Sequence, residues 1–306
     1  MAAVETLLNV GKCTQSGFNG TSNDFCPLDI KRIKKLLRTS PGFKFPEGFE
    51  FTLDNLLLEE QKGNIIPLYT LEDNTFTTAE NGVQTFGGGV KSLIEKMPIE
   101  MQAKLVNGVQ GYQNTLTVEK AKVHGFFIVD VDDTVFGQKT KDGLFGAITS
   151  PFFQVMPYTG AGDESAGYMI EWQLDRNQFD NRLVGLRDED YDADMENVKG
   201  ANNLVIDIPT APVVGDTAVN FTVHRLEDKV AQLGLDNSEI EVSVNGTAEV
   251  SPTITDNGDG SYSVAVSALS LADEVSIRLY DGTYTIVNLD GVLLKGNTAD
   301  TITVSA

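Results

Sequence analysis

Apolar and polar residues alternate in short stretches from Thr210 to the end of the chain. The clearest stretches are 239–244, 262–266 and 275–279. Alternation with a period of two is typical of strands that bury one face. The stretches are separated by residue pairs that supply the positive φ angles of tight hairpin turns. These pairs are Asn245-Gly246, Asn257-Gly258, Asp281-Gly282 and Asp290-Gly291.

Several short strands at this spacing predict an immunoglobulin-like β-sandwich over residues 210–306. The segment Pro209-Thr210-Ala211-Pro212 precedes it and has the composition of a stiff joint. At 306 residues the chain is near the size at which one hydrophobic core stops growing. We therefore predict two domains, 1–209 and 210–306.

The middle of the chain also has strong strand signals. Residues 125–130 form a continuous apolar run, which is typical of a strand buried on both faces. Two turn sequences then flank a predicted hairpin between 132 and 146, and alternating strands follow at 152–156 and 168–174. Residues 64–69 read as a strand with an edge proline. The pattern predicts a β-sandwich or barrel core.

Helix signals are few. Asp29 is placed to cap a helix that ends before Ser40-Pro41, with apolar residues on one face and basic residues around the other. A second helix is possible over 92–106, although Pro98 interrupts it, and 176–185 has the pattern of a helical turn. The expected fold class is thus mainly β, with an α+β first domain that contains one or two short helices.

The first thirty residues are rich in Gly, Asn, Ser and Thr, and this composition predicts an arm or long loop. Both cysteines, Cys13 and Cys26, lie in it, with no CxxC spacing. We interpret them as free thiols, and a disulfide between them is the alternative. Gly87-Gly88-Gly89 has the composition of a hinge.

The formal net charge of −21 argues against general electrostatic binding to nucleic acid, which requires Lys and Arg to neutralise phosphates. No apolar run is long enough to span a membrane as a helix. The N-terminal sequence lacks the basic start and apolar run of a signal peptide. We expect a chain that is neither embedded in a membrane nor secreted by the classical route.

Candidate chemistry is sparse. The two histidines, His124 and His224, lie in different predicted domains, and no serine has a nucleophile-elbow sequence. We expect no catalytic residue and no cofactor, and therefore not an enzyme. Asp188, Asp190 and Asp192 alternate as calcium ligands do, but without the glycine and closing glutamate of an EF-hand loop, so we favour a solvated acidic loop.

A binding surface for sugars would need exposed aromatic residues. The single tryptophan, Trp172, falls in an alternating strand, where core packing is the simpler interpretation. The C-terminal domain supplies few aromatic residues, and these are Phe221, Tyr262, Tyr280 and Tyr284. The sequence therefore offers little surface on which a sugar ring could stack.

Two charged clusters suggest a contact between copies of the chain in an assembly. The basic cluster consists of Lys31, Arg32, Lys34, Lys35 and Arg38, and the acidic cluster of Asp188, Glu189, Asp190, Asp192 and Asp194. If they lie on opposite sides of the first domain, head-to-tail association can close into a ring. The alternative is that both clusters are solvated, or that they pair within one subunit.

The order of strands from Gly108 onwards resembles the β-rich subunits that build the tails of tailed bacteriophages. The resemblance rests on the buried strand ending in Asp130, the hairpin with Gly137 and Gly143, and the strands that follow. The segment 257–264 is similar to the turn and strand of many phage and bacterial sandwich domains. Such subunits have a β core with one helix and a long loop, and many carry a C-terminal immunoglobulin-like domain.

The resemblance implies a non-enzymatic virion protein of the tail tube, tail ring or neck, made in the host cytoplasm. Its expected partners are its own copies, in a ring or tube, and other tail or neck proteins, with no membrane and no specific nucleic acid. One alternative is a surface adhesin or capsid decoration protein that binds host glycans through the sandwich. Another, less favoured, is a metal-assisted hydrolase that uses the acidic cluster.

Overall fold

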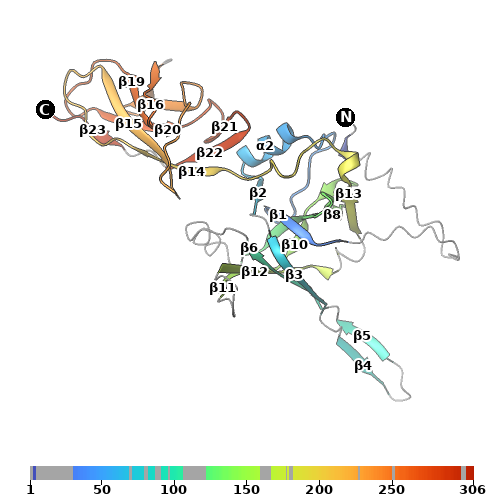
Figure 1. Ribbon diagram of the computed structural model, residues 1–306. Coiled ribbons are helices and arrows are strands. Elements are labelled where there is room, and N and C mark those ends of the chain that lie inside the picture. Colours follow the sequence, from blue (N-terminus) through green and yellow to red (C-terminus); the bar gives the residue numbers. More distant parts are fainter. Residues whose placement is uncertain are drawn as a thin grey trace. The chain divides into compact units, whose positions relative to one another are not determined.

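The computed structural model describes residues 3–4, 30–68, 71–78, 82–86, 91–95, 97–105, 122–158, 167–176, 178, 182–226, 228–249, 252–297 and 301–306. The fold is mainly β, as predicted (Figure 1). The chain divides into two compact units. Met1–Leu56 and Asn64–Lys199 form the first, and Leu57–Gly63 with Gly200–Ala306 form the second.

The first unit contains two larger sheets and one hairpin. A seven-stranded sheet has the order β13-β8-β7-β1-β2, with β10 also on β7 and β9 on β8, and a four-stranded sheet has the order β11-β12-β6-β3. The hairpin β4–β5 connects β3 to β6 (Figure 1). The strands are β1 (Ile33–Thr39), β2 (Ile65–Pro67), β3 (Leu71–Thr78), β4 (Gly82–Thr85), β5 (Lys91–Glu95), β6 (Ile99–Leu105), β7 (His124–Asp130), β8 (Val135–Lys139), β9 (Phe145–Gly146), β10 (Ile148–Ser150), β11 (Phe152–Tyr158), β12 (Gly167–Leu174) and β13 (Leu183–Leu186).

Strand β7 is buried on both faces, which confirms the prediction from its continuous apolar run. Phe126 and Ile128 face a core that also contains Trp172, and Phe127 and Val129 face a second core on the other side of the sheet. Trp172 has 0% of its surface exposed, so its predicted place in a core is confirmed. The seven-stranded sheet therefore separates two hydrophobic cores.

The first core lies between the two sheets, and the second is rich in aromatic rings. Phe45 stacks on Phe49 with centroids 4.4 Å apart, and Phe51 and Phe145 pack edge-on at 6.4 Å. Val4 is buried in this second core and its N–H donates to the carbonyl of Phe49 at 2.8 Å. The predicted N-terminal arm is thus anchored at Val4.

Other parts of the sequence predictions fall outside the described residues. These are the rest of the predicted arm, with Cys13 and Cys26, and the Gly87–Gly89 hinge.

The predicted helix after Asp29 is wrong, because residues 33–39 form strand β1 between β7 and β2. Leu36 belongs to the first core and Leu37 to the second. A strand with apolar residues on both faces does not alternate between apolar and polar positions. The spacing of apolar and basic residues in this segment therefore matched the pattern of an amphipathic helix. The second possible helix is also absent, since β5 and β6 occupy its place and β6 alternates strictly between buried and half-buried residues.

The observed α-helix, α2 (Leu53–Gln61), was not predicted. Thr52 begins it: its hydroxyl accepts from the N–H of Asn55 at 3.3 Å and its carbonyl from the N–H of Leu56 at 3.0 Å. This is the usual arrangement of an N-cap threonine. Leu56 then packs into the second core.

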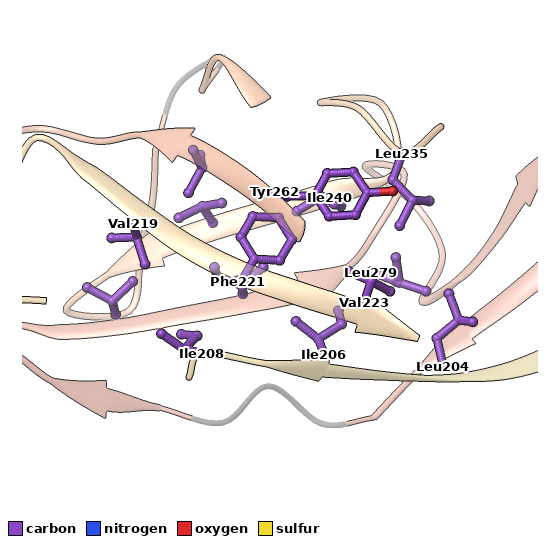
Figure 2. Packing of buried hydrophobic residues seen from close by; sticks show 14 of the residues in the cluster. Leu204, Ile206, Ile208, Val219, Phe221, Val223, Leu235, Ile240, Tyr262 and Leu279 are labelled. Carbon is purple, nitrogen blue, oxygen red and sulfur yellow. The ribbon is translucent and has the colours of Figure 1, made fainter. Parts of the chain in front are cut away.

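The second unit is a β-sandwich, as predicted. Its sheets have the orders β18-β19-β15-β14-β22-β21 and β17-β16-β20-β23. The strands are β14 (Asn202–Asp207), β15 (Ala218–Arg225), β16 (Ile240–Val244), β17 (Thr247–Ala248), β18 (Ile254–Asp256), β19 (Ser261–Ala265), β20 (Glu274–Leu279), β21 (Ile286–Leu289), β22 (Val292–Gly296) and β23 (Ile302–Thr303). Residues of both sheets meet in one core, where Phe221 stacks on Tyr262 with centroids 5.3 Å apart (Figure 2).

The division between the units lies at Lys199 and Gly200, and not at the proline-flanked joint. Strand β14 explains the difference, because it pairs antiparallel with β15 and parallel with β22. Pro209–Pro212 is therefore a connection inside the sandwich, between β14 and β15. Among the described residues, no helix is both long and apolar enough to cross a membrane.

Candidate assembly interface

The basic cluster lies on and before strand β1, and it is not the exposed face of a helix. Lys35 and Arg38 are only 6% and 7% exposed. Lys31 pairs with Asp132, and Lys34 pairs with Asp133. Lys31 and Lys34 are therefore paired within the subunit, but with Asp132 and Asp133 and not with the acidic cluster.

Lys35 holds a segment distant in sequence. Its ammonium group donates to the carbonyl oxygens of Met195 and Val198, the second at 2.8 Å. These carbonyls directly follow the acidic cluster. The structure thus brings Lys35 of the basic cluster next to the end of the acidic segment in the same chain, which argues against clusters on opposite sides of the domain.

The acidic segment, residues 188–198, is a strap over the second core of the first unit. It begins with a 3₁₀ turn, Asp188–Asp190, and then alternates. Tyr191, Ala193 and Met195 are buried, while Asp192 and Asp194 are exposed. The acidic residues that alternate in the sequence therefore form the solvent-exposed face of an extended strap.

Tyr191 fixes the strap at its centre. Its hydroxyl donates to the carbonyl of Asp133. Burial, with the nearby Asp133 carboxylate, raises the pKa of Tyr191 far above its usual value, so the phenol stays protonated as a donor. The backbone of Asp192 also bridges to Thr52.

The acidic segment does not form a metal site in the described part of the chain. No group of three His, Cys, Asp or Glu side chains there is close enough to hold a metal ion. The Asp190 carboxylate accepts from the N–H of Arg187, and Asp194 accepts from the N–H of Glu196 at 2.9 Å. These carboxylates serve local turns, so the weak metal candidates gain no support.

A second surface was not singled out from the sequence. The four-stranded sheet buries one face in the first core, and its other face is half-exposed. On that outer face Gln154 donates to Glu171, and Gln173 donates to Glu100 at 3.1 Å. Amide and carboxylate side chains therefore form cross-strand pairs on this half-exposed face.

The two edges of this sheet are β3 and β11. Each has one strand neighbour among the described residues, β6 and β12 respectively. An edge strand presents unpaired N–H and C=O groups, which are a template for pairing with another chain. The signal in the sequence was the alternation at 99–105 and 168–174, but strand order cannot be read from it.

Comparisons with known proteins identify no relative. No family model and no curated protein matches the chain. The head-to-tail pairing of the two charged clusters between copies stays a prediction. In the basic cluster the exposed residues are Lys31 and Arg32, and Lys31 already pairs with Asp132 in the same subunit.

Proposed function

We propose that this chain is a non-enzymatic structural subunit that assembles with its own copies into a ring or tube. The observation that carries the proposal is the four-stranded sheet, with its half-exposed amide and carboxylate face and its two edges, β3 and β11, each with one strand neighbour in the described part of the chain. The two edges belong to different strands, so contact between them is heterologous, and such contacts generate rings when the rotation closes. Closure also removes the free edges.

The location that we propose is the tail or neck of a bacteriophage virion. This part rests on the resemblance of the segment after Gly108 to tail subunits, and the mainly β first unit with the helix α2 is compatible with it. Partners would be further copies and neighbouring tail or neck proteins. The charge of −21 disfavours binding to nucleic acid by general attraction.

The second unit is proposed as an appendage and not as part of the ring. It has its own core and carries fourteen acidic against four basic residues from 210 to 306. Mutual repulsion disfavours close packing of such units against each other. We expect assembly to survive deletion of residues 200–306, which removes β14 with the rest of the sandwich, as judged by particle size. Loss of the particles would assign the contact to the sandwich.

Glycan binding by the sandwich is the main rival. Two of its four aromatic residues, Phe221 and Tyr262, are buried in the core, and the Tyr280 ring is covered by the Arg278 guanidinium at 4.7 Å. Little aromatic surface remains for a sugar ring to stack on. A glycan array should therefore give no selective signal, and a reproducible single-glycan signal would favour the rival.

The direct test of assembly is light scattering after size-exclusion chromatography of the full chain over a range of concentrations. We expect a discrete particle of many copies. A monomer at all concentrations would refute the proposal.

A further inference from the structure

We propose that β3 of one copy pairs antiparallel with β11 of the next copy, over residues 75–78 and 152–156. The inference rests on the proposed function and names the contact through which it operates. It assigns the partner, the strand direction and the limits of pairing.

Strand direction follows from the order of the sheet. Each neighbouring pair in β11-β12-β6-β3 is antiparallel, so β11 and β3 run in opposite directions. Rotation about an axis along the strands keeps these directions. The β3 edge of one copy then meets a β11 edge that runs antiparallel to it, and the ladder continues with the same hydrogen-bond pattern.

On β3 the pairing begins after a bulge. The register between β3 and β6 shifts between Glu72 and Thr75. Strand β3 also contacts β1. Shortly before β3 begins, the N–H of Leu68 donates to the carbonyl of Leu36 in β1. A bulge twists an edge and interrupts its ladder, so the regular edge is limited to residues 75–78.

On β11 the pairing ends at Pro157. A proline inside a strand places its nitrogen toward the free edge, because it has no N–H to give to the neighbouring strand. Alternation along the strand then turns the backbone N–H groups of Phe153 and Val155 toward the same edge. The free edge of β11 therefore offers two donors and stops at Pro157.

The faces of the sheet restrict the register further. Thr75 is exposed and lies opposite Gln102 on the outer face, and Gln154 lies on that face opposite Glu171. A shift by one residue would turn core side chains to solvent. If Thr75 lay opposite Phe152, residues 76–78 would lie opposite 149–151, outside β11. Thr75 of one copy must therefore lie opposite Gln154 or Met156 of the next, and not opposite Phe153 or Val155.

Disulfide formation between copies tests this contact in the full chain. The background is Cys13→Ser with Cys26→Ser, and Thr75→Cys is combined in turn with Gln154→Cys and Met156→Cys. Within one chain these positions lie on opposite edges of the sheet, about 14 Å apart by strand spacing, which is too far for a disulfide. Mild oxidation should convert one of the two double variants into a ladder of linked copies on a non-reducing gel.

The matched control moves one cysteine inward by exchanging Gln102→Cys for Thr75→Cys, together with Gln154→Cys. It should stay monomeric on the gel, since residue 102 is on an inner strand. Each variant is also sized under reducing conditions by light scattering. Particles that form without a ladder in any double variant would overturn the pairing and leave the proposed function standing.

Two further results would be decisive. Dimers from Thr75→Cys alone would show β3 against β3, which overturns the pairing that we propose. If the parent chain itself forms no particle, the proposed function fails, and the pairing fails with it.

Discussion

Replacement of the buried lysine on β1 by methionine tests how the strap is held. Lys35→Met keeps the apolar stem and removes the ammonium group that donates to the carbonyls of Met195 and Val198. Each of the two buried acceptors left without its partner costs about 1–3 kcal/mol, or about 2–6 kcal/mol for both. Part of this is recovered because the buried charge itself is costly to desolvate. We expect the unfolding free energy of the first unit to fall by about 2–4 kcal/mol.

The assay is urea denaturation followed by tryptophan fluorescence. Trp172 is the chain's single tryptophan and is buried in the first unit, so its signal reports on that unit. Limited proteolysis should also cut the strap, residues 188–198, sooner in the variant. The matched control is Lys31→Met, whose exposed pair with Asp132 should contribute less than about 1 kcal/mol.

Equal losses in the two variants would refute the reasoning. That result would mean that the carbonyls of the strap reach water or other donors when Lys35 is absent. The strap would then be held by Tyr191, by the backbone bridge from Asp192 to Thr52 and by its buried apolar residues.

Two predictions concern the second unit. Gly260→Ala should lower its unfolding free energy by about 1–3 kcal/mol, because φ is +87° and a Cβ would lie 2.6 Å from that of Ala231. Gly258→Ala has a similar φ but open space and should cost less, as circular dichroism in urea would show; equal costs would refute the packing argument. The Asn245 amide holds the pKa of Asp273 below its usual value, so Asn245→Ala should raise that pKa in an NMR titration. A depressed carboxyl pKa stabilises the fold above the unfolded-state pKa, so one part of the loss should be present at neutral pH and vanish as pH falls through the folded-state pKa. Another part is independent of pH, because residue 245 has a positive φ that alanine disfavours. A loss with no pH-dependent part would contradict the prediction.

The sequence predicted those parts of the fold in which local pattern and burial agree. The buried run at β7 and the alternation of β12 and β20 each matched the observed strands. Asn245 and Gly246 have φ angles of 52° and 73°, as a hairpin turn with two positive φ angles requires. In each case neighbouring residues alone determine the local structure.

The predictions that were wrong concern elements whose structure depends on contacts with residues far away in the sequence. Strand β1 carries Lys35 into the interior, where carbonyls about 160 residues later in the chain accept from it. Helix α2 had a readable signal in Thr52, which the alternation around Phe51 obscured. The domain boundary was displaced because β14 finds its partner β22 far along the chain.

The candidate interface shows the same limit. The charged clusters could be seen in the sequence, but their partners within the subunit could not. The outer face and the edges of the four-stranded sheet depend on the order β11-β12-β6-β3. In this order β3 and β6 are adjacent, although the hairpin β4–β5 lies between them in the sequence. Strand order of this kind is set by tertiary packing.

Electron microscopy of the purified full-length chain tests the central claim most directly. We expect negatively stained particles to be rings, or tubes of stacked rings, with one uniform diameter. A field of particles of monomer size at the highest attainable concentration would contradict the account.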